Sequence, residues 1–274
     1  MIARWLACCV FSMGARAGAQ NLHCTKPDGE GILFIGPSFY RATHGYDAHG
    51  TRYSNPATFS RSQLGAYVEY GATEDLTLIA NLAVVRLSSV DARTSHQSTG
   101  LSNPEFAFAA AVERLPFIGR LFCAAGLALK LPVVGQGDPL IGFAQTDIEG
   151  RLRQLGALNL WSYSGYWVTD VALRYRSGAP ADEFRFNALG ALRYTPNWTA
   201  MLSAVTVTGL RNGSPIAVNN NYTLDPDYSS YQVQAAALYR SARTRFEQIG
   251  ISQEVAGRNS GSGTTISLVI WQYF

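Results

Sequence analysis

The sequence predicts an all-β protein, an antiparallel up-and-down transmembrane β-barrel of about twelve strands. Three observations lead to this prediction. From Gly31 onward, apolar residues alternate with polar or small ones in stretches of roughly ten residues. The connections between these stretches alternate between short and long. The chain also ends on an amphipathic stretch whose last residue is a phenylalanine.

Alternation with a period of two is typical of a β-strand, because successive side chains point to opposite faces. The clearest case covers residues 163–176, where Leu173 and Tyr175 lie on an apolar face and Arg174 lies on a charged one. The predicted strands cover residues 32–44, 59–71, 76–88, 104–114, 120–132, 143–154, 163–177, 183–194, 198–210, 229–241, 244–256 and 264–274. Their number is even, as closure of a bacterial barrel requires.

The connections support this arrangement, since a transmembrane barrel has short periplasmic turns and longer external loops. Short connections are predicted at residues 72–75, 115–119, 195–197 and 241–243, and longer ones, rich in Gly, Asn, Ser and Pro, at 45–58, 89–103, 133–142, 211–228 and 257–263. Two connections do not fit. Residues 155–162 are long for a periplasmic turn, and residues 178–182 are short for an external loop.

The composition indicates a chain that keeps much of its surface out of water. Only 15% of the residues are charged, against about 25% in an ordinary soluble domain. Helical membrane spans are excluded after the N-terminal region, because they need apolar runs of about 20 residues. Runs such as Phe106–Val112 end too soon, in that case at Glu113.

Residues 1–19 have the features of a secretory signal peptide: a positive Arg4, an apolar stretch at 5–13 and a small-residue cleavage site at 17–19. We therefore expect a cleaved signal over 1–19, a mature barrel over 20–274 and location in the outer membrane. A short membrane anchor is the alternative, but the apolar stretch is well short of a span. Loss of Arg4 and Arg16 lowers the formal charge from +3 to +1, which argues against nucleic-acid binding.

Two of the four cysteines, Cys24 and Cys123, remain after signal removal. The oxidising periplasm permits a disulfide between them. Sequence separation does not reveal whether their geometry allows one. A disulfide and two free thiols therefore both stay open.

A periplasmic β-sandwich or lipocalin-like barrel would show the same period with its apolar face turned inward. Two features favour the inverted, lipid-facing arrangement. The strands are long, and the apolar faces end in aromatic residues, as interfacial girdles do. These residues are Trp167, Tyr175, Tyr194, Trp198, Tyr231 and Tyr239.

The final segment, Ile266–Phe274, resembles the C-terminal strand that the barrel-assembly machinery recognises in outer-membrane proteins. Its apolar and polar residues alternate up to the terminal aromatic Phe274. The partners we expect are therefore outer-membrane lipid, the assembly machinery through this strand, and a small-molecule solute.

If the apolar faces meet lipid, the opposite faces line a lumen. The predicted lumen residues are Glu69, Asn81, Glu105, Lys130, Glu149, Arg151, Asp170, Arg174, Arg185, Arg193, Gln232, Gln234 and Glu247. Both signs of charge are present. They either pair across neighbouring strands and plug the barrel, or form a polar pathway that selects or binds solute.

The densest charged element is the predicted hairpin at residues 174–185. Gly178, Ala179 and Pro180 supply its turn. The charged residues on its two arms are Arg174, Arg176, Asp182, Glu183 and Arg185. We expect them to form a cross-strand ion-pair cluster that fixes the hairpin register, or to grip a carboxylated or hydroxylated solute at the external mouth through arginine.

The same hairpin carries a family resemblance, on the residues 146–149, 171–183 and 196–198. These stretches are similar to outer-membrane proteins assigned to the meta-pathway of phenol degradation and to others encoded near exopolysaccharide loci. Residues 67–71 and 100–105 fit the general strand pattern of the same family. The resemblance implies an outer-membrane barrel that transports aromatic compounds, with no catalytic residues. Asn187 departs from the aspartate expected after the hairpin.

One pattern raises an enzyme hypothesis. His96 and Ser98 resemble the His-x-Ser motif of the outer-membrane phospholipase, another twelve-stranded barrel, where histidine activates a serine nucleophile. That site needs both side chains on the lipid-facing rim of a strand. Here residues 95–100 read as a Ser- and Thr-rich loop, and Thr99 replaces the usual Asn.

No metal or cofactor site is predicted. The four histidines occur singly, without ligand spacing, and no Gly-rich phosphate loop follows a strand. Asp225 and Asp227 offer oxygen ligands for Ca²⁺, but an acidic, Asn-rich loop of this kind is usually just solvated. The sequence thus predicts a non-enzymatic channel that passes or binds a small solute, aromatic or saccharide-like. A plugged structural or assembly barrel and, with least support, a surface lipolytic enzyme are the alternatives.

Overall fold

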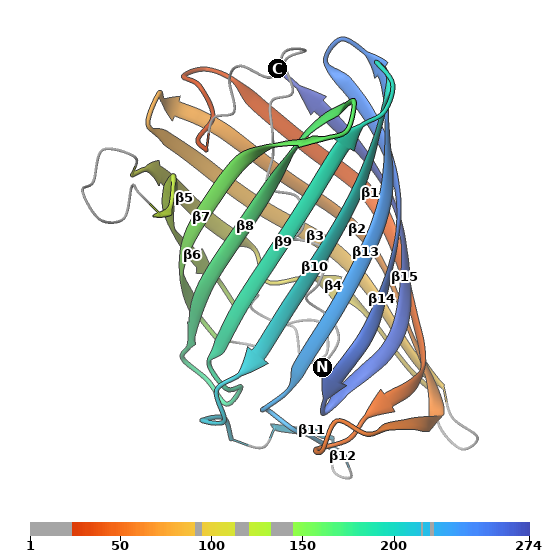
Figure 1. Cartoon of the computed structure of the whole chain (residues 1–274). Helices are drawn as coiled ribbons and strands as arrows, with labels where there is room; N and C mark the ends of the chain where they lie inside the picture. Colours follow the sequence, from red (N-terminus) through yellow and green to blue (C-terminus); the bar gives the residue numbers. More distant parts are fainter. Residues whose placement is uncertain (1–23, 91–94, 113–120, 133–144, 215, 220–221) are drawn as a thin grey trace.

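The computed structural model describes residues 24–90, 95–112, 121–132, 145–214, 216–219 and 222–274. They form one closed antiparallel β-barrel (Figure 1). The strands are β1 (Gly31–Tyr46), β2 (Arg52–Thr73), β3 (Leu76–Val90), β4 (Ser95–Leu101), β5 (Glu105–Ala111), β6 (Ala124–Lys130), β7 (Asp147–Leu160), β8 (Tyr163–Arg176), β9 (Glu183–Arg193), β10 (Trp198–Gly209), β13 (Ser229–Ala242), β14 (Arg245–Arg258) and β15 (Ser260–Tyr273). A separate hairpin, β11 (Ile216–Asn219) and β12 (Tyr222–Leu224), lies between β10 and β13.

The barrel has twelve strand positions, as predicted. Its sheet contains thirteen strands, but β4 and β5 pair with the two halves of the same strand β3 and so share one position. The break between them contains Pro104, which has no N–H to give to the ladder. The ends of the chain close the barrel, because β1 pairs with both β2 and β15.

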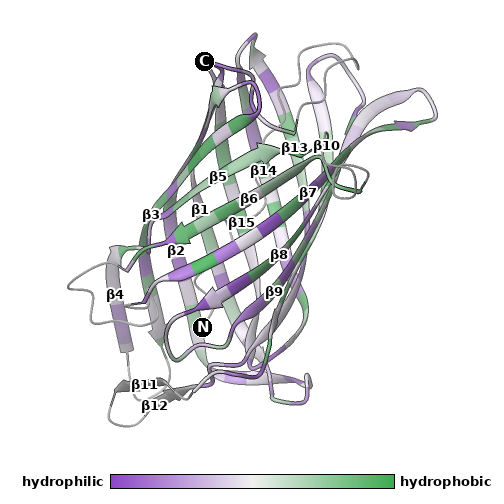
Figure 2. Cartoon of the chain, turned by 90° about the vertical axis from the view of Figure 1, so that its left-hand side faces the viewer, coloured by the Kyte–Doolittle hydropathy of each residue, from purple (hydrophilic) through white to green (hydrophobic). Residues whose placement is uncertain are grey.

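The apolar strand faces point outward, which confirms the lipid-facing arrangement and makes the soluble alternative wrong. On β8, Leu173 and Tyr175 are each 61% exposed, whereas Arg174 between them is 3% exposed. On β14, Ile249 is exposed and Gln248 is buried. Figure 2 shows the hydrophilic and hydrophobic residues alternating along β7 and β8.

The two ends of the barrel differ in their connections. Tight turns at residues 74–75, 161–162, 194–197 and 243–244 lie at the end that holds the C-terminus, which we call the short-turn end. The opposite end, here called the long-loop end, carries the β11–β12 hairpin (Figure 1). The predicted exception at 155–162 is wrong, since β7 and β8 continue until a two-residue turn.

Three predicted loops are shorter than expected. Strands β1 and β2 fill most of residues 45–58, and β14 and β15 leave Asn259 alone as the connection within 257–263. Residues 95–101, predicted as loop, form β4. These parts of the strands are polar on both faces, so they lack the apolar alternation on which the prediction depended. The predicted connections 115–119 and 133–142, part of the connection 89–103, and the adjoining ends of three predicted strands lie outside the described residues, at 91–94, 113–120 and 133–144.

The connection between β1 and β2 is ordered by Asp47. Its Oδ1 accepts backbone N–H groups of His49 and Thr51, each at 2.8 Å. The hydrogen bond from Thr51 is the largest cause that holds the pKa of Asp47 below its ordinary value of 3.8.

The open question about the cysteines is settled by a disulfide. Cys24 and Cys123 are bonded, with a Cα–Cα distance of 5.8 Å. The disulfide joins the segment 24–30, which precedes β1, to the start of β6 at the short-turn end. Further contacts hold this segment there: Lys26 N donates to Thr77 Oγ1 at 2.6 Å, and its Nζ lies 3.8 Å from Glu69 Oε2.

The predicted signal peptide, residues 1–19, lies outside the described residues. Within the described part of the chain, no helix has the length and apolar character needed to cross a membrane.

Candidate solute-binding lumen

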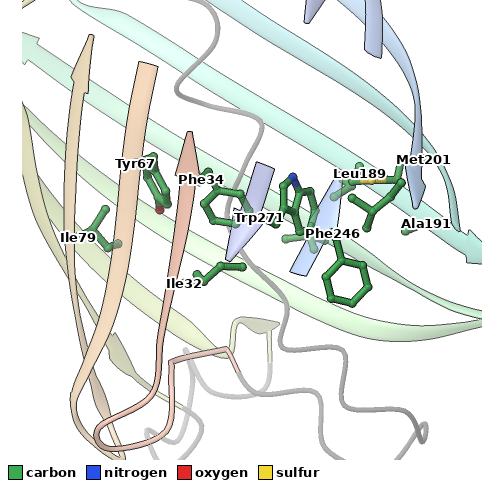
Figure 3. Close-up of a cluster of buried hydrophobic side chains, with 11 residues drawn as sticks. Ile32, Phe34, Tyr67, Ile79, Leu189, Ala191, Met201, Phe246 and Trp271 are labelled. Atoms are coloured by element: carbon green, nitrogen blue, oxygen red, sulfur yellow. The ribbon is translucent and has the colours of Figure 1, made fainter. Parts of the chain in front are cut away.

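The lumen has an apolar band near the short-turn end, which we call the apolar belt (Figure 3). Its members are buried, and all sit on inward faces of the strands. They are Ile32, Phe34, Tyr67, Ile79, Val168, Leu189, Ala191, Met201, Leu238, Phe246 and Trp271. The belt therefore draws on nine strands: β1 to β3, β8 to β10 and β13 to β15.

Aromatic rings form the thickest part of the belt. The ring centroids of Phe34 and Trp271 are 4.9 Å apart in an edge-on arrangement, and those of Phe34 and Tyr67 are 5.6 Å apart. The polar ends of these side chains have partners: Trp271 Nε1 donates to Gln248 Oε1 at 3.1 Å, and the Tyr67 hydroxyl donates to Glu69 Oε1 at 2.7 Å. The rings are thus fixed inside the barrel, and each of them is at most 7% exposed.

The opposite half of the lumen, toward the long-loop end, carries a charged wall. It consists of eight side chains on four strands: Glu105, Asp147, Glu149, Arg151, Arg174, Arg176, Glu183 and Arg185. The strand register creates it. Glu149 lies opposite Arg174 on β8, and Arg174 in turn lies opposite Glu183 on β9.

Glu149 is the centre of this wall and is 1% exposed. Its Oε2 lies 2.8 Å from Arg174 Nε and 2.9 Å from Arg185 Nη1, and its Oε1 accepts from Arg151 Nε at 2.9 Å. The Nη2 of Arg174 also reaches Glu105 Oε2 at 2.7 Å. Charge-assisted hydrogen bonds of this kind are strong and directional, so they hold four strands in one register.

Glu183 forms a second centre. It accepts from Arg176 Nη1 at 2.7 Å and from the Tyr228 hydroxyl at 3.0 Å. Arg176 also lies 3.7 Å from Asp147, and Asp147 accepts from Gln145 Nε2 at 2.6 Å. The sequence-predicted hairpin cluster is therefore present in part, because Arg176, Glu183 and Arg185 lie together, while Arg174 turns to carboxylates on other strands.

The charged wall is balanced in sign. It contains four arginines and four carboxylates by the definition above. A neighbouring pair, Arg153 and Asp170, adds one charge of each sign, with Nε and Oδ1 2.8 Å apart. Mutually neutralised groups give little net field, so the wall does not favour ions of one sign.

Three predicted site residues lie apart from the wall. Asp182 is in the β8–β9 turn, where it accepts from Arg176 N at 2.8 Å and from Asn212 Nδ2 at 2.7 Å. Arg193, at the short-turn end, donates to Ser164 Oγ at 3.4 Å. Glu69 is also at that end, beside the segment 24–30.

One lumen prediction is wrong. Glu247 faces outward on β14, where its carboxylate lies 3.5 Å from Arg245 and is 48% exposed. Glu247 lies directly opposite Ile270 of β15 and therefore shares its outward face. Asn187, by contrast, faces the lumen opposite Asp170.

Sequence reasoning missed Asp147 and the whole apolar belt. A signal for the belt exists at the start of β1, where residues 32–35 are apolar without interruption. An uninterrupted run means that both faces of the strand are apolar, so one apolar face must meet the lumen.

The remaining motifs also have defined places. His96 and Ser98 lie on the inward face of β4, opposite Ser89 and Leu87, so the expected loop is wrong and the lipid-facing rim that the phospholipase site needs is not formed.

Asp227 has partners within the protein, since its Oδ2 lies 3.0 Å from Arg258 Nη2. Asp225 likewise accepts from Asn259 Nδ2 at 2.7 Å. The described residues contain no group of three or more His, Cys, Asp or Glu side chains placed to hold a metal ion.

Comparison with solved structures gives the same fold. An outer membrane channel from Pseudomonas putida F1 is similar with a TM-score of 0.66 and 12% identity, over 91% of this chain and 97% of that one. The translocator domain of the autotransporter NalP from Neisseria meningitidis is similar with a TM-score of 0.48 and 10% identity, over 91% and 90%. The CymD monoaromatic hydrocarbon channel gives a TM-score of 0.42 and 9% identity, over 91% and 89%.

At 12% identity, the similarity to the Pseudomonas putida channel establishes the fold alone. The chain has the closed, twelve-stranded architecture of an outer-membrane β-barrel. No family model matches its sequence, and no curated protein does.

Proposed function

We propose that the protein is an outer-membrane channel that binds a small apolar solute in its lumen and lets it pass. The apolar belt is the observation that supports this proposal most. A water-filled porin has a polar interior, whereas here eleven buried apolar side chains line one band of the lumen. Such a band offers an apolar solute favourable contacts that water does not provide.

The expected affinity is modest. A small aromatic solute that removes about 150 Å² of apolar surface from water gains roughly 4 kcal/mol. Part of this gain is lost to the reduced freedom of the bound solute. The result is a dissociation constant of about 1 mM or weaker, which permits both binding and release.

We propose an aromatic solute, for two reasons. The belt presents the rings of Phe34, Tyr67, Phe246 and Trp271, and aromatic pairs gain from edge-on or offset contacts beyond the area they bury. The resemblance of residues 171–183 to proteins assigned to phenol degradation points to the same class of solute.

The route to the membrane belongs to the proposal as well. Residues 1–19 would direct secretion, the mature chain would begin at Gln20, and the assembly machinery would recognise the strand that ends at Phe274. The short-turn end, with the disulfide-tied segment 24–30, would then face the periplasm.

Binding can be measured through Trp271, which lies within the belt. In a mature chain whose other three tryptophans, Trp161, Trp167 and Trp198, are replaced by phenylalanine, bromobenzene should quench Trp271 fluorescence in a saturable way. Phe34→Ala should weaken this quenching about tenfold, because it removes the ring that contacts Trp271. Ile35→Ala, on the adjacent outward-facing position, is the matched control and should leave the quenching unchanged.

A plugged structural barrel is the second candidate, and the charged wall favours it. Its charged side chains form ion pairs with one another and hold four strands together. A structural role therefore accounts for these charges without a bound solute. Bilayer recordings separate the two candidates: a channel conducts, and Arg174→Ala or Arg176→Ala alters its ion selectivity, whereas a plugged barrel that folds correctly stays silent.

A further inference from the structure

Arg61, on the inward face of β2, differs from the other buried arginines. Arg153, Arg174, Arg176 and Arg185 each have a guanidinium nitrogen within 2.9 Å of a carboxylate oxygen. Arg61 is 7% exposed and forms no ion pair within the described part of the chain. Its Nη2 donates to the neutral Gln63 Oε1, and its Nε has no hydrogen-bond partner.

A buried charge without a counter-charge is costly. Proteins keep such a group where a ligand supplies the missing partner, since departures from local rules concentrate at functional sites. A guanidinium presents a planar fork of donors that matches a carboxylate. The free Nε of Arg61 leaves part of this fork available.

Arg61 lies beside a buried apolar cluster. In the strand register, Arg61 lies between Tyr40 on β1 and Leu87 on β3. Leu87, Val85 and Ala83 form a buried apolar cluster against Phe59, the next inward residue of β2. An anion at Arg61 would therefore be well shielded from water, which strengthens its attraction to the guanidinium.

The carboxylate that Tyr40 contacts, Glu254, is already engaged. Glu254 Oε2 accepts from the Tyr40 hydroxyl at 2.7 Å and from Gly263 N at 2.8 Å. Tyr40 thus directs its hydroxyl to β14 and not to Arg61, and Glu254 does not act as the counter-ion.

A small hollow of about 50 Å³, which opens in part to the lumen, begins beside Gln63. Gly36 and Gly65 lie directly opposite each other in its wall. At Gly36 a larger side chain would meet the backbone of Leu268 on β15. The far side of the hollow is lined by Phe34 and Tyr67 of the apolar belt.

We propose that Arg61 binds the carboxylate of an amphipathic monocarboxylic acid whose apolar body lies in the hollow over Gly36 and Gly65, against Phe34 and Tyr67. This inference rests on the proposed function, because the apolar body occupies part of the belt. It adds an acidic head group to the solute, which the belt alone does not require.

The experiment compares two probes of the same size, 4-phenylbutanoate and 4-phenylbutan-1-ol, by calorimetric titration of the full chain in detergent. The wild type should bind the carboxylate at least about tenfold more tightly than the alcohol, a factor that corresponds to 1.4 kcal/mol. Arg61→Met should remove this preference and leave alcohol binding unchanged. Arg61→Lys should retain part of it, and Arg41→Met, which removes a nearby outward-facing cation, should behave as the wild type.

Equal affinity of the wild type for the two probes, or a preference that survives Arg61→Met, would overturn the inference and leave the proposed function standing. If neither probe binds, both fail. The wild-type comparison needs no variant, so it remains decisive even if Arg61→Met does not fold.

Discussion

Replacing Glu149 by glutamine tests whether the charged wall stabilises the barrel. The carboxylate of Glu149 is 1% exposed and serves three arginines. Removing one partner of a buried pair typically costs about 3–5 kcal/mol, because the other charge stays buried. Two of the arginines keep another carboxylate, Arg174 at 2.7 Å from Glu105 and Arg185 at 3.9 Å from Glu183. We therefore expect a loss near the lower limit, about 3 kcal/mol.

The assay is urea unfolding of the refolded protein in lipid vesicles, followed by tryptophan fluorescence. Glu247→Gln is the matched control, since Glu247 pairs with Arg245 at 3.5 Å with both side chains nearly half exposed. Such a surface pair contributes about 0–1 kcal/mol. Equal effects of the two substitutions would refute the reasoning, because the buried network would then add no more than an exposed pair.

Three further predictions concern the ends of the barrel. Replacing Cys24 and Cys123 by serine removes a crosslink across a sequence separation of 99. The free energy of unfolding should fall by on the order of 4 kcal/mol. An unchanged urea midpoint would show that the disulfide does not stabilise the barrel. The lowered pKa of Asp47 means that its ionised carboxylate stabilises the turn above pH 3.8, and that this stabilisation is lost as the pH falls further. If NMR titration gave the Asp47 carboxyl group a pKa of 3.8 or higher, this prediction would be wrong. Phe274→Ser should reduce the amount of protein assembled in the outer membrane, whereas Phe39→Ser, which removes a similarly exposed aromatic, should not.

The strands were predictable because one physical condition, lipid on the outer face, imposes a period of two along each of them. The pattern in residues 163–176 gave the correct faces for Leu173 and Arg174. It failed where strands extend past the apolar band, as in β4, since both faces there are polar. It also misplaced Glu247, where one residue of offset exchanges inside and outside.

The site was harder to predict, because its contacts depend on register between strands. The sequence placed Arg174 in a hairpin cluster, but its carboxylates are Glu149 and Glu105, which lie 25 and 69 residues away in the chain. Arg61 gave no sequence signal, because its importance comes from the absence of a nearby carboxylate, and only the three-dimensional arrangement shows that.

Single-channel recording in the presence of a neutral aromatic solute tests the central proposal most directly. If the solute binds in the apolar belt, benzyl alcohol should interrupt the ion current of the wild type in a concentration-dependent way, and Phe34→Ala should shorten the interruptions while Ile35→Ala does not. A folded protein that conducts without any response to the solute would contradict binding in the belt, and one that never conducts would contradict the channel.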